Sequence, residues 1–338
     1  FTSATNVYNT AVGFNAGAAV TTGIQNVLVG GLSGDAITTG DNNVALGHEA
    51  LTANTVGDRS TAVGNFALKS QNPSSNADMY NVAVGHNAGG EVTTGSLNTL
   101  IGGFAGDAIT TGESNVAVGY EALTDTTTGA DNTAVGELAL ANNTTGVRNV
   151  ALGASALFTK TTGNDNTAIG TNALYANTTA SNNVAVGMNS LTANTTGSEN
   201  TAVGTTSLDA NTEGDDNVGM GYAALGANTT GNKNVAIGNN ALDANTTADN
   251  NTAVGFDALT ANTTGATNTA VGKLALDANT VGGANTVVGA DALSADTKGS
   301  RSVAIGTSAL EVQNFTSATN VYNTAVGFNA GVSVTTGV

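Results

Sequence analysis

The chain has 338 residues, no cysteine, no tryptophan and a formal net charge of −17 at pH 7. Because so acidic a surface repels polyanions, we exclude nucleic acid and anionic membrane as expected partners. Without cysteine there are no disulfides or thiolate metal sites, so stacking of the chain itself has to provide stability. No apolar run is long enough to insert into a membrane.

One sequence of seventeen residues accounts for almost the whole chain and is cleanest over 251–267. Numbered from its Asn, this repeat has Gly255 at position 5, and equivalent glycines occur nineteen times from Gly13 to Gly327. A fixed short period is typical of repeat architectures, so we predict a single continuous repeat domain over 1–338. Because the chain starts without Met or a signal peptide, we expect it to be an excerpt of a longer repetitive chain.

Positions 1 to 5 predict a strand followed by a corner. Position 1 is Asn in seventeen of nineteen copies, with Ser60 and Ser302 as the exceptions, position 2 is Thr or Val, and position 4 is Val, Ile, Leu or Met. Such residues favour a strand of about five residues, and the following Gly permits a corner or a positive φ. We therefore predict an all-β parallel solenoid of about nineteen coils. A helical repeat is the alternative, but seventeen residues cannot hold two helices.

Positions 9 and 12 vary together. Position 9 is Leu in fourteen copies and Gly in five, and those five carry Val or Ile at position 12, where Asn is usual. The pairs are Gly17 with Val20, Gly34 with Ile37, Gly89 with Val92, Gly106 with Ile109, and Gly331 with Val334. Replacement of one apolar volume by another indicates that both positions face the same close-packed core.

Asn at positions 1 and 12 lies above its copies in neighbouring coils, which predicts side-chain amide ladders along the stack. In one representative copy the predicted ladder and core residues are Asn183, Val184, Val186, Gly187, Leu191 and Asn194. Asn-Thr-Thr also matches a glycan acceptor. A residue type repeated at every corner is more simply structural.

Two copies are longer than the others by four residues. We expect the additional residues to bulge from the coil as insert loops near 72–79 and 314–322. Residues 1–17 recur identically as 315–331. We expect this pattern to continue beyond both ends.

Both faces of the predicted strand Thr252-Ala253-Val254 are nearly apolar, unlike those of a half-solvated strand. One face can line the coil and the other needs a cover, so we expect a homo-oligomer or filament. The alternative is a monomer in which small Ala residues leave little surface to hide.

Positions 6 and 7 vary most, which places them on the outward surface. Exposed aromatic rings there offer flat apolar area to sugars or protein receptors. The candidate surface-binding residues are Phe14, Phe66, Phe104, Tyr120, Tyr222 and Phe256. The alternative is scattered surface or intersubunit contacts, and because Phe66 and Phe104 are not in adjacent copies, we expect no continuous strip.

No metal or cofactor site is predicted. His48 and His86 share one repeat position, but an intervening copy separates them. Acidic residues such as Asp41, Asp215 and Asp249 recur in the turn before the strand, where loop carboxylates could bind calcium. They lack the Gly-Gly-x-Gly-x-Asp repeat of calcium-binding rolls, so solvated charges that deter lateral aggregation are favoured.

Catalysis is not predicted, because the chain has no Gly-x-Ser-x-Gly elbow and no phosphate-binding loop. A polysaccharide-cleaving enzyme remains an alternative, since parallel β-helices can carry paired carboxylates. An ice-binding surface is another, because Thr recurs at one position, as at Thr144, Thr161, Thr178 and Thr195. Against it, the neighbouring position varies and includes Glu213, Val281 and Lys298.

The run Asn-Val-Ala-Val-Gly with Leu or Gly at position 9, as in 183–191 and 81–89, resembles the head repeats of trimeric autotransporter adhesins of the YadA type. Related Asn-Thr-Ala-Val-Gly repeats are also typical of bacteriophage tail-fibre proteins. The resemblance covers essentially the whole chain and implies a left-handed β-roll, assembled as a homotrimer on a cell or virion surface and used for attachment. We therefore expect an extracellular structural and adhesive fibre segment that displays elements for a cell-surface or glycan ligand. A bacteriophage tail fibre is the main alternative.

Overall fold

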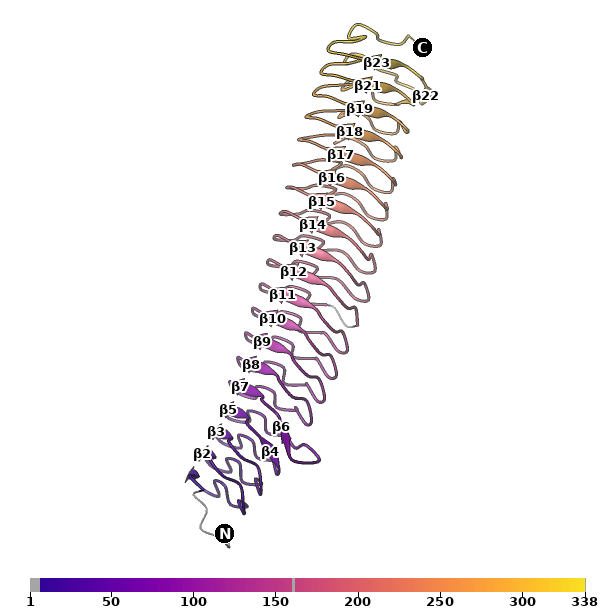
Figure 1. Ribbon diagram of the computed structural model, residues 1–338. Helices are drawn as coiled ribbons and strands as arrows, with labels where there is room; N and C mark the ends of the chain where they lie inside the picture. The colour runs from indigo at the N-terminus through magenta and orange to yellow at the C-terminus, as the bar shows by residue number, and fades with distance from the viewer. Residues whose placement is uncertain (1–6, 160–161, 338) are drawn as a thin grey trace. The chain divides into compact units, whose positions relative to one another are not determined.

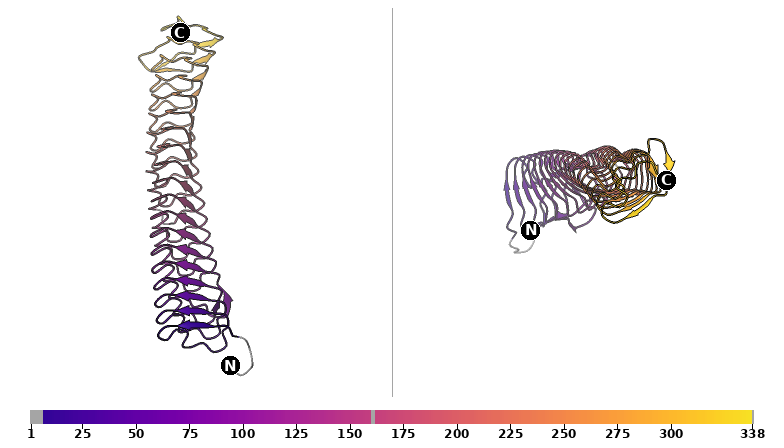
Figure 2. Two further views of the ribbon diagram at one scale, coloured as in Figure 1. Left: turned by 90° about the vertical axis from the view of Figure 1, so that its left-hand side faces the viewer. Right: turned by 90° about the horizontal axis from the view of Figure 1, so that it is seen from above.

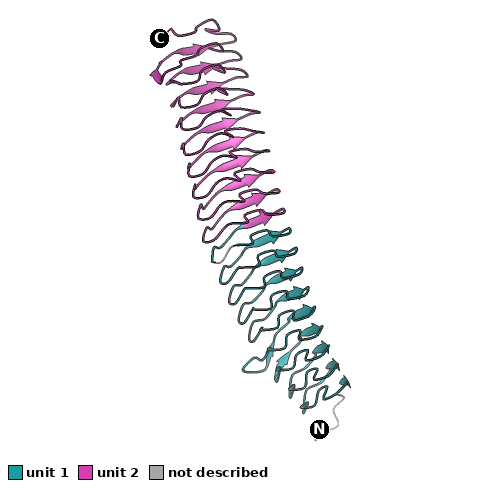
Figure 3. Cartoon of the chain, turned by 180° about the vertical axis from the view of Figure 1, so that it is seen from behind, with its two compact units in different colours: residues 1–166 teal, residues 167–338 magenta. Residues whose placement is uncertain are grey.

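A computed structural model describes residues 7–159 and 162–337, and in them the chain is an all-β parallel solenoid of about nineteen coils without a helix (Figure 1). The predicted fold class is confirmed. Successive strands within each unit lie one above another (Figure 2). The chain divides into two compact units, residues 1–166 and 167–338, which are described separately below (Figure 3).

Each coil contributes one strand of three residues, shorter than the predicted five, and four additional strands have two residues. The strands of unit 1 are β1 (Thr10–Val12), β2 (Val27–Val29), β3 (Val44–Leu46), β4 (Gly57–Asp58), β5 (Thr61–Val63), β6 (Ala77–Asp78), β7 (Val82–Val84), β8 (Thr99–Ile101), β9 (Val116–Val118), β10 (Thr133–Val135) and β11 (Val150–Leu152). Those of unit 2 are β12 (Thr167–Ile169), β13 (Val184–Val186), β14 (Thr201–Val203), β15 (Val218–Met220), β16 (Val235–Ile237), β17 (Thr252–Val254), β18 (Thr269–Val271), β19 (Thr286–Val288), β20 (Gly299–Ser300), β21 (Val303–Ile305), β22 (Thr319–Asn320) and β23 (Thr324–Val326).

In every three-residue strand except β1, only the middle residue is buried in the core. In β13, Ala185 is fully buried, whereas Val184 is 36% exposed and Val186 is half-buried. The prediction that Val184 and Val186 fill the core is therefore wrong. Alternation along the strand turns positions 2 and 4 outward. The volume beside the small position-3 residue is filled instead by Leu at position 9, as Leu208 Cδ1 lies 3.3 Å from an ideal Cβ on Gly219.

Position 9 adopts a left-handed backbone in both kinds of coil. Leu191 is fully buried with a φ of +51°, and Gly34 has a φ of +53°. This conformation costs an L-residue about 1–2 kcal/mol. Burial of a Leu side chain stabilises by about 1.5–3 kcal/mol, so it offsets that strain. Glycine can replace Leu here without strain, provided that another side chain fills the core.

Two replacements fill the core of the Gly coils. Ile37 at position 12 is fully buried, which confirms that positions 9 and 12 face the same core. The second replacement is Leu in place of Ala at position 3, at Leu28 and Leu100. An ideal Cβ would lie 2.8 Å from a Leu28 methyl carbon both at Gly34 and at Gly17 in the adjacent coil. One Leu therefore occupies the space vacated in two coils.

The predicted asparagine ladders are present inside the stack. At position 12, Asn194 Nδ2 donates to Asn177 Oδ1 at 3.0 Å. At position 1 the partners are mainly backbone groups: Asn183 Oδ1 accepts the Asn200 N–H at 2.9 Å, and Asn183 Nδ2 donates to the Gly197 carbonyl at 2.9 Å. The four asparagine side chains are fully buried. The ladders therefore provide hydrogen bonds for amides that would be costly to bury unpaired.

The two inserts keep the register of the main strands. Within the predicted insert regions 72–79 and 314–322, short strands β6 and β22 pair in parallel with β4 and β20. Across the first insert, Thr61 still pairs with Val82. The additional residues are therefore accommodated outside the coil without disturbing the stack.

Candidate binding surface

A glycine corner directs positions 6 and 7 to the outside of the coil. Gly187 has a φ of +136°, and an ideal Cβ on it would lie 2.5 Å from the Gly204 carbonyl oxygen of the next coil. Only glycine fits so close an approach. Position 7 then adopts a left-handed conformation, with φ of +64° at Phe66 and +58° at Phe104. The same two outward positions therefore recur in successive coils.

Five rings from five consecutive coils of unit 1 form a continuous row, the aromatic ladder: His48, Phe66, His86, Phe104 and Tyr120. Neighbouring ring centroids are 5.6, 5.7, 5.3 and 6.3 Å apart, with interplanar angles of 77° to 88°. The expectation that Phe66 and Phe104 belong to no continuous strip is wrong, because His86 lies between them. The missed signal is an alternation: the ring occupies position 6 in one coil and position 7 in the next.

The position-6 rings are the more exposed members of the aromatic ladder. Tyr120 is 51% exposed, the His48 side chain is 50% exposed and His86 is also exposed. Phe66 and Phe104 are half-buried between them. Edge-to-face contacts contribute about 0.5–1.5 kcal/mol each beyond area burial. The two phenylalanines therefore pack against the three exposed rings and stabilise their positions.

Polar groups border the aromatic ladder. Glu49 Oε1 lies 3.7 Å from His48 Nε2. A hydrogen bond with the Glu121 carboxylate raises the pKa of the Tyr120 phenol. The backbone N–H of His48 donates to Asn65 Oδ1 at 3.1 Å. The surface therefore combines aromatic area with hydrogen-bonding groups.

The other predicted aromatic residues lie outside the aromatic ladder. Phe14 is 76% exposed in unit 1, and in unit 2 Tyr222 is 57% and Phe256 is 49% exposed. Tyr222 and Phe256 occupy position 6 two coils apart, and the intervening position 7 is Asn240. Without a ring at that position, Tyr222 and Phe256 remain separate exposed rings.

The two histidines are members of the aromatic ladder and do not form a pair. The Phe66 ring lies between His48 and His86 and contacts both. Among residues 7–159 and 162–337, no group of three or more His, Asp or Glu side chains is arranged to hold a metal ion.

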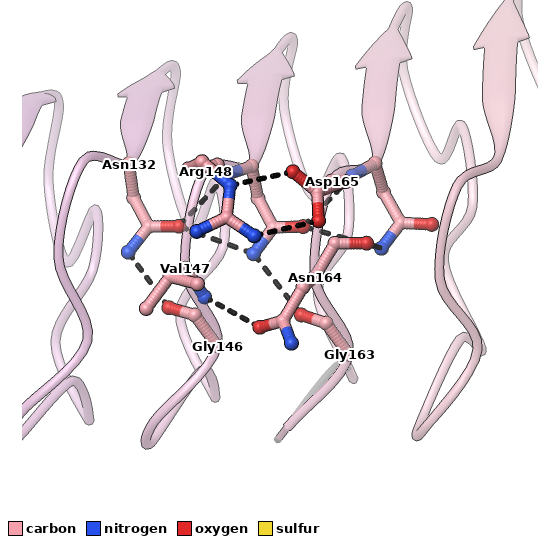
Figure 4. A network of polar contacts seen from close by, with 9 residues as sticks. Asn132, Gly146, Val147, Arg148, Gly163, Asn164 and Asp165 are labelled. Carbon is pink, nitrogen blue, oxygen red and sulfur yellow. Dashed lines mark hydrogen bonds and ion pairs between the residues drawn. The ribbon is translucent and has the colours of Figure 1, made fainter.

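Polar side chains in the turn before the strand cap the backbone of the preceding coil. Asp215 Oδ1 accepts the Ser198 N–H at 2.7 Å. Figure 4 shows the equivalent contact in unit 1, where Asn164 Oδ1 accepts the Val147 N–H at 2.9 Å. The prediction that such acids are solvated charges does not include this structural role. The signal was the recurrence of Asp, Asn and Ser at position 16.

Figure 4 also shows a charged contact beside these turn residues. Arg148 Nε and Nη2 donate to the two carboxylate oxygens of Asp165 at 2.7 and 2.9 Å. This bidentate contact raises the pKa of Arg148 further. Both side chains are exposed, so the pair contributes little to stability and mainly fixes the surface geometry.

Three carboxylates in unit 2 are partly removed from solvent at position 10. Burial raises the pKa of Asp209, Asp243 and Asp277. Asp277 Oδ1 has no hydrogen-bond partner within the part of the chain that the structure describes. Burial therefore makes the charged form of these acids less favourable than it is in water.

The threonine ladder considered for ice binding has internal hydrogen bonds. Thr178 Oγ1 donates to the Thr195 carbonyl at 3.0 Å, and Thr195 Oγ1 donates to the Thr212 carbonyl at 2.9 Å. Both hydroxyls belong to half-buried residues. Thr161 lies outside the described residues. The hydroxyl hydrogens are thus directed along the stack and not toward water.

Aliphatic side chains at position 4 form an outward row on each unit, the apolar row. Its members include Leu46, Ile101 and Leu152 in unit 1 and Ile169, Ile237 and Ile305 in unit 2, each 38% or 39% exposed. The repeated exposure of branched aliphatic residues at one position is unusual for a surface that remains uncovered.

Comparison with known proteins adds no assignment: no family model matches the chain, and no curated protein shows significant sequence similarity to it. In the described residues no helix is long and apolar enough to cross a membrane.

Proposed function

We propose that the chain is a segment of an extracellular structural and adhesive fibre, in which a β-solenoid spaces or displays surface-binding elements without turnover. The observation that carries the proposal is the separation of two kinds of position. Hydrogen-bonded Asn and Thr ladders occupy the positions that hold the coils together. Chemical variety is concentrated at positions 6 and 7, where the aromatic ladder lies.

The proposal is tested by attachment of the full chain to bacterial or animal cells and to immobilised glycans. We expect saturable binding, no depolymerisation of polysaccharides and no thermal hysteresis. Depolymerisation would favour the β-helix enzyme, and thermal hysteresis would favour the ice-binding solenoid. Absence of binding to every surface would leave only the structural part of the proposal.

We also propose that the apolar row is covered by further copies of this chain in a homo-oligomer, with a trimer favoured by the sequence resemblance. The support is the exposed aliphatic side chain at position 4 in both units, as at Ile101 and Ile237. Sedimentation equilibrium of the full chain should give a multiple of the 32.9 kDa chain mass. The variant Ile101→Asp/Ile237→Asp should shift it toward monomer, whereas a purely monomeric parent chain contradicts the proposal.

A further inference from the structure

The aromatic ladder presents three rings to solvent at a regular interval. His48, His86 and Tyr120 occupy position 6 of every second coil, and Phe66 and Phe104 fill the space between them. Since parallel strands are about 4.8 Å apart, the exposed rings recur at roughly 10 Å intervals along the unit. The surface is therefore periodic and suits an extended ligand better than a compact one.

Each exposed ring has a polar side chain next to it in the same coil. These position-7 neighbours are Glu49 beside His48, Asn87 beside His86, and Glu121 beside Tyr120. All three neighbours are half-buried. The repeating unit of the surface is thus one aromatic ring together with one carboxylate or amide that can accept a hydrogen bond from a hydroxyl.

This combination points to the chemistry of a carbohydrate chain. A pyranose ring offers an apolar face of C–H groups to an aromatic ring, and its hydroxyls donate to carboxylates and amides. A polysaccharide repeats these features along its length, as the aromatic ladder does. Glu49, Glu121 and the net charge of −17 disfavour anionic polymers.

A protein partner fits this surface less well. Stable protein interfaces bury about 800 Å² on each partner around an apolar centre depleted of charged groups. The aromatic ladder is one ring wide, and carboxylates from Glu49 and Glu121 border it. An approaching protein would have to desolvate these charges or place a cation opposite each of them, whereas hydroxyl groups can hydrogen-bond to them directly.

We propose that the aromatic ladder of unit 1 binds a neutral, extended glycan chain that lies along the stack, with sugar rings against His48, His86 and Tyr120 and hydroxyls bonded to Glu49, Asn87 and Glu121. This inference rests on the proposed adhesive function and names its ligand class. The isolated rings Tyr222 and Phe256 of unit 2 lack the intervening ring and do not form such a site.

The test is calorimetric titration of the full chain with cellohexaose, chitohexaose and mannohexaose, with heparin and an oligolysine peptide as charged probes. At least one neutral hexasaccharide should bind. The variant His48→Ala/His86→Ala/Tyr120→Ala should weaken its binding by at least about tenfold, because three ring contacts are removed. The matched variant Tyr222→Ala/Phe256→Ala, which removes exposed rings from unit 2, should bind like the parent chain.

A second variant, Phe66→Leu/Phe104→Leu, keeps apolar volume but removes the bracing rings, and we expect an intermediate loss. Circular dichroism establishes that each variant is folded. The inference is overturned if no neutral hexasaccharide binds at millimolar concentration, if only heparin or oligolysine binds, or if the folded triple variant binds as tightly as the parent chain.

Cell attachment separates this inference from the proposed function. Attachment that the triple variant retains, without hexasaccharide binding, rejects the glycan site and leaves the adhesive function in place. Hexasaccharide binding that the triple variant loses, without attachment to any cell, supports the glycan site and rejects the adhesive function.

Discussion

The two units solve the same packing problem in different ways. In unit 2, seven successive coils carry Asn at position 12, from Asn177 to Asn279, and Leu at position 9 fills the core. In unit 1, three coils with Gly at position 9 carry a fully buried Ile37, Val92 or Ile109 at position 12. The comparison shows that the fold requires a constant core volume and satisfied buried amides, but not one fixed side chain at each position.

The two units also differ in how aromatic rings are arranged on their outer surfaces. Unit 1, in which positions 9 and 12 vary, carries the continuous aromatic ladder. Unit 2 carries separate rings at Tyr222 and Phe256. The presence of aromatic residues alone is therefore not sufficient to form a continuous row of rings. What distinguishes unit 1 is that a ring occurs in every coil from His48 to Tyr120 and alternates between two adjacent positions.

The largest effect on unfolding free energy is expected from exchanging Leu and Gly at position 9 between the two units. Leu208→Gly in unit 2 removes a fully buried side chain without a compensating residue and should cost about 2–5 kcal/mol, less the relief of its left-handed backbone. Gly34→Leu in unit 1 inserts a side chain 2.8 Å from Leu28 and should cost about 1–3 kcal/mol. Urea unfolding measures both.

The control is Gly34→Leu/Leu28→Ala, which removes one of the two side chains, Leu28 and Ile37, that lie closest to a side chain at position 34. It should recover part of the stability lost in Gly34→Leu. No recovery would show that core volume is not what links these two positions.

Features that lie within one coil can be predicted from the repeat. The period predicted the coil, and the joint variation of Gly34 and Ile37 located the core, because volume must be conserved within one coil. The prediction that Val184 and Val186 point into the core is wrong, since a strand of three residues directs only its middle side chain to the interior. The aromatic ladder was missed because ring contacts form between neighbouring coils at different repeat positions, which comparison of equivalent positions does not detect.

Continuity of the asparagine ladder at position 12 should also affect the unfolding free energy. Asn228 is fully buried, donates to Asn211 Oδ1 at 2.8 Å and accepts from Asn245 Nδ2 at 2.9 Å. Asn228→Ala should lower the unfolding free energy by about 1–3 kcal/mol, because buried amide groups lose partners. Asn54→Ala in unit 1 is the control: Asn54 bonds only locally to Gly57, and a smaller loss is expected. Equal losses would mean that the ladder adds nothing beyond the local turn.

Unit 2 should become more stable on mild acidification. Burial raises the pKa of Asp209, Asp243 and Asp277 above the ordinary value of 3.8. Because the folded-state pKa is the higher one, this stabilisation is complete below pH 3.8 and is lost as the pH rises through the raised values. The urea midpoint should therefore rise from pH 7 toward pH 4 by a modest amount.

The variant Asp243→Asn should raise the midpoint at pH 7 and reduce its dependence on pH. Asp216→Asn removes the same charge from an exposed turn and controls for net charge. A pH dependence that Asp243→Asn leaves unchanged would assign the effect to surface repulsion instead of burial.

The smallest effect on stability, but the sharpest on the surface, is expected from Asn240→Phe. Asn239 Oδ1 accepts the Tyr222 N–H at 3.1 Å, as Asn65 Oδ1 does for His48. Position 240 also has the left-handed φ, +54°, that Phe66 adopts. The new ring should join Tyr222 and Phe256 and give ring-current shifts of their NMR signals. Unshifted signals would show that alternation between positions 6 and 7 is not sufficient to connect rings.

Hydroxyl-radical footprinting of the full chain, with and without a bound neutral hexasaccharide, compares the two surfaces in one experiment. Our account predicts protection of Phe66, Phe104 and Tyr120 and unchanged oxidation of Tyr222 and Phe256. Protection confined to the rings of unit 2, or equal protection of both sets, would contradict the assignment of ligand binding to the aromatic ladder.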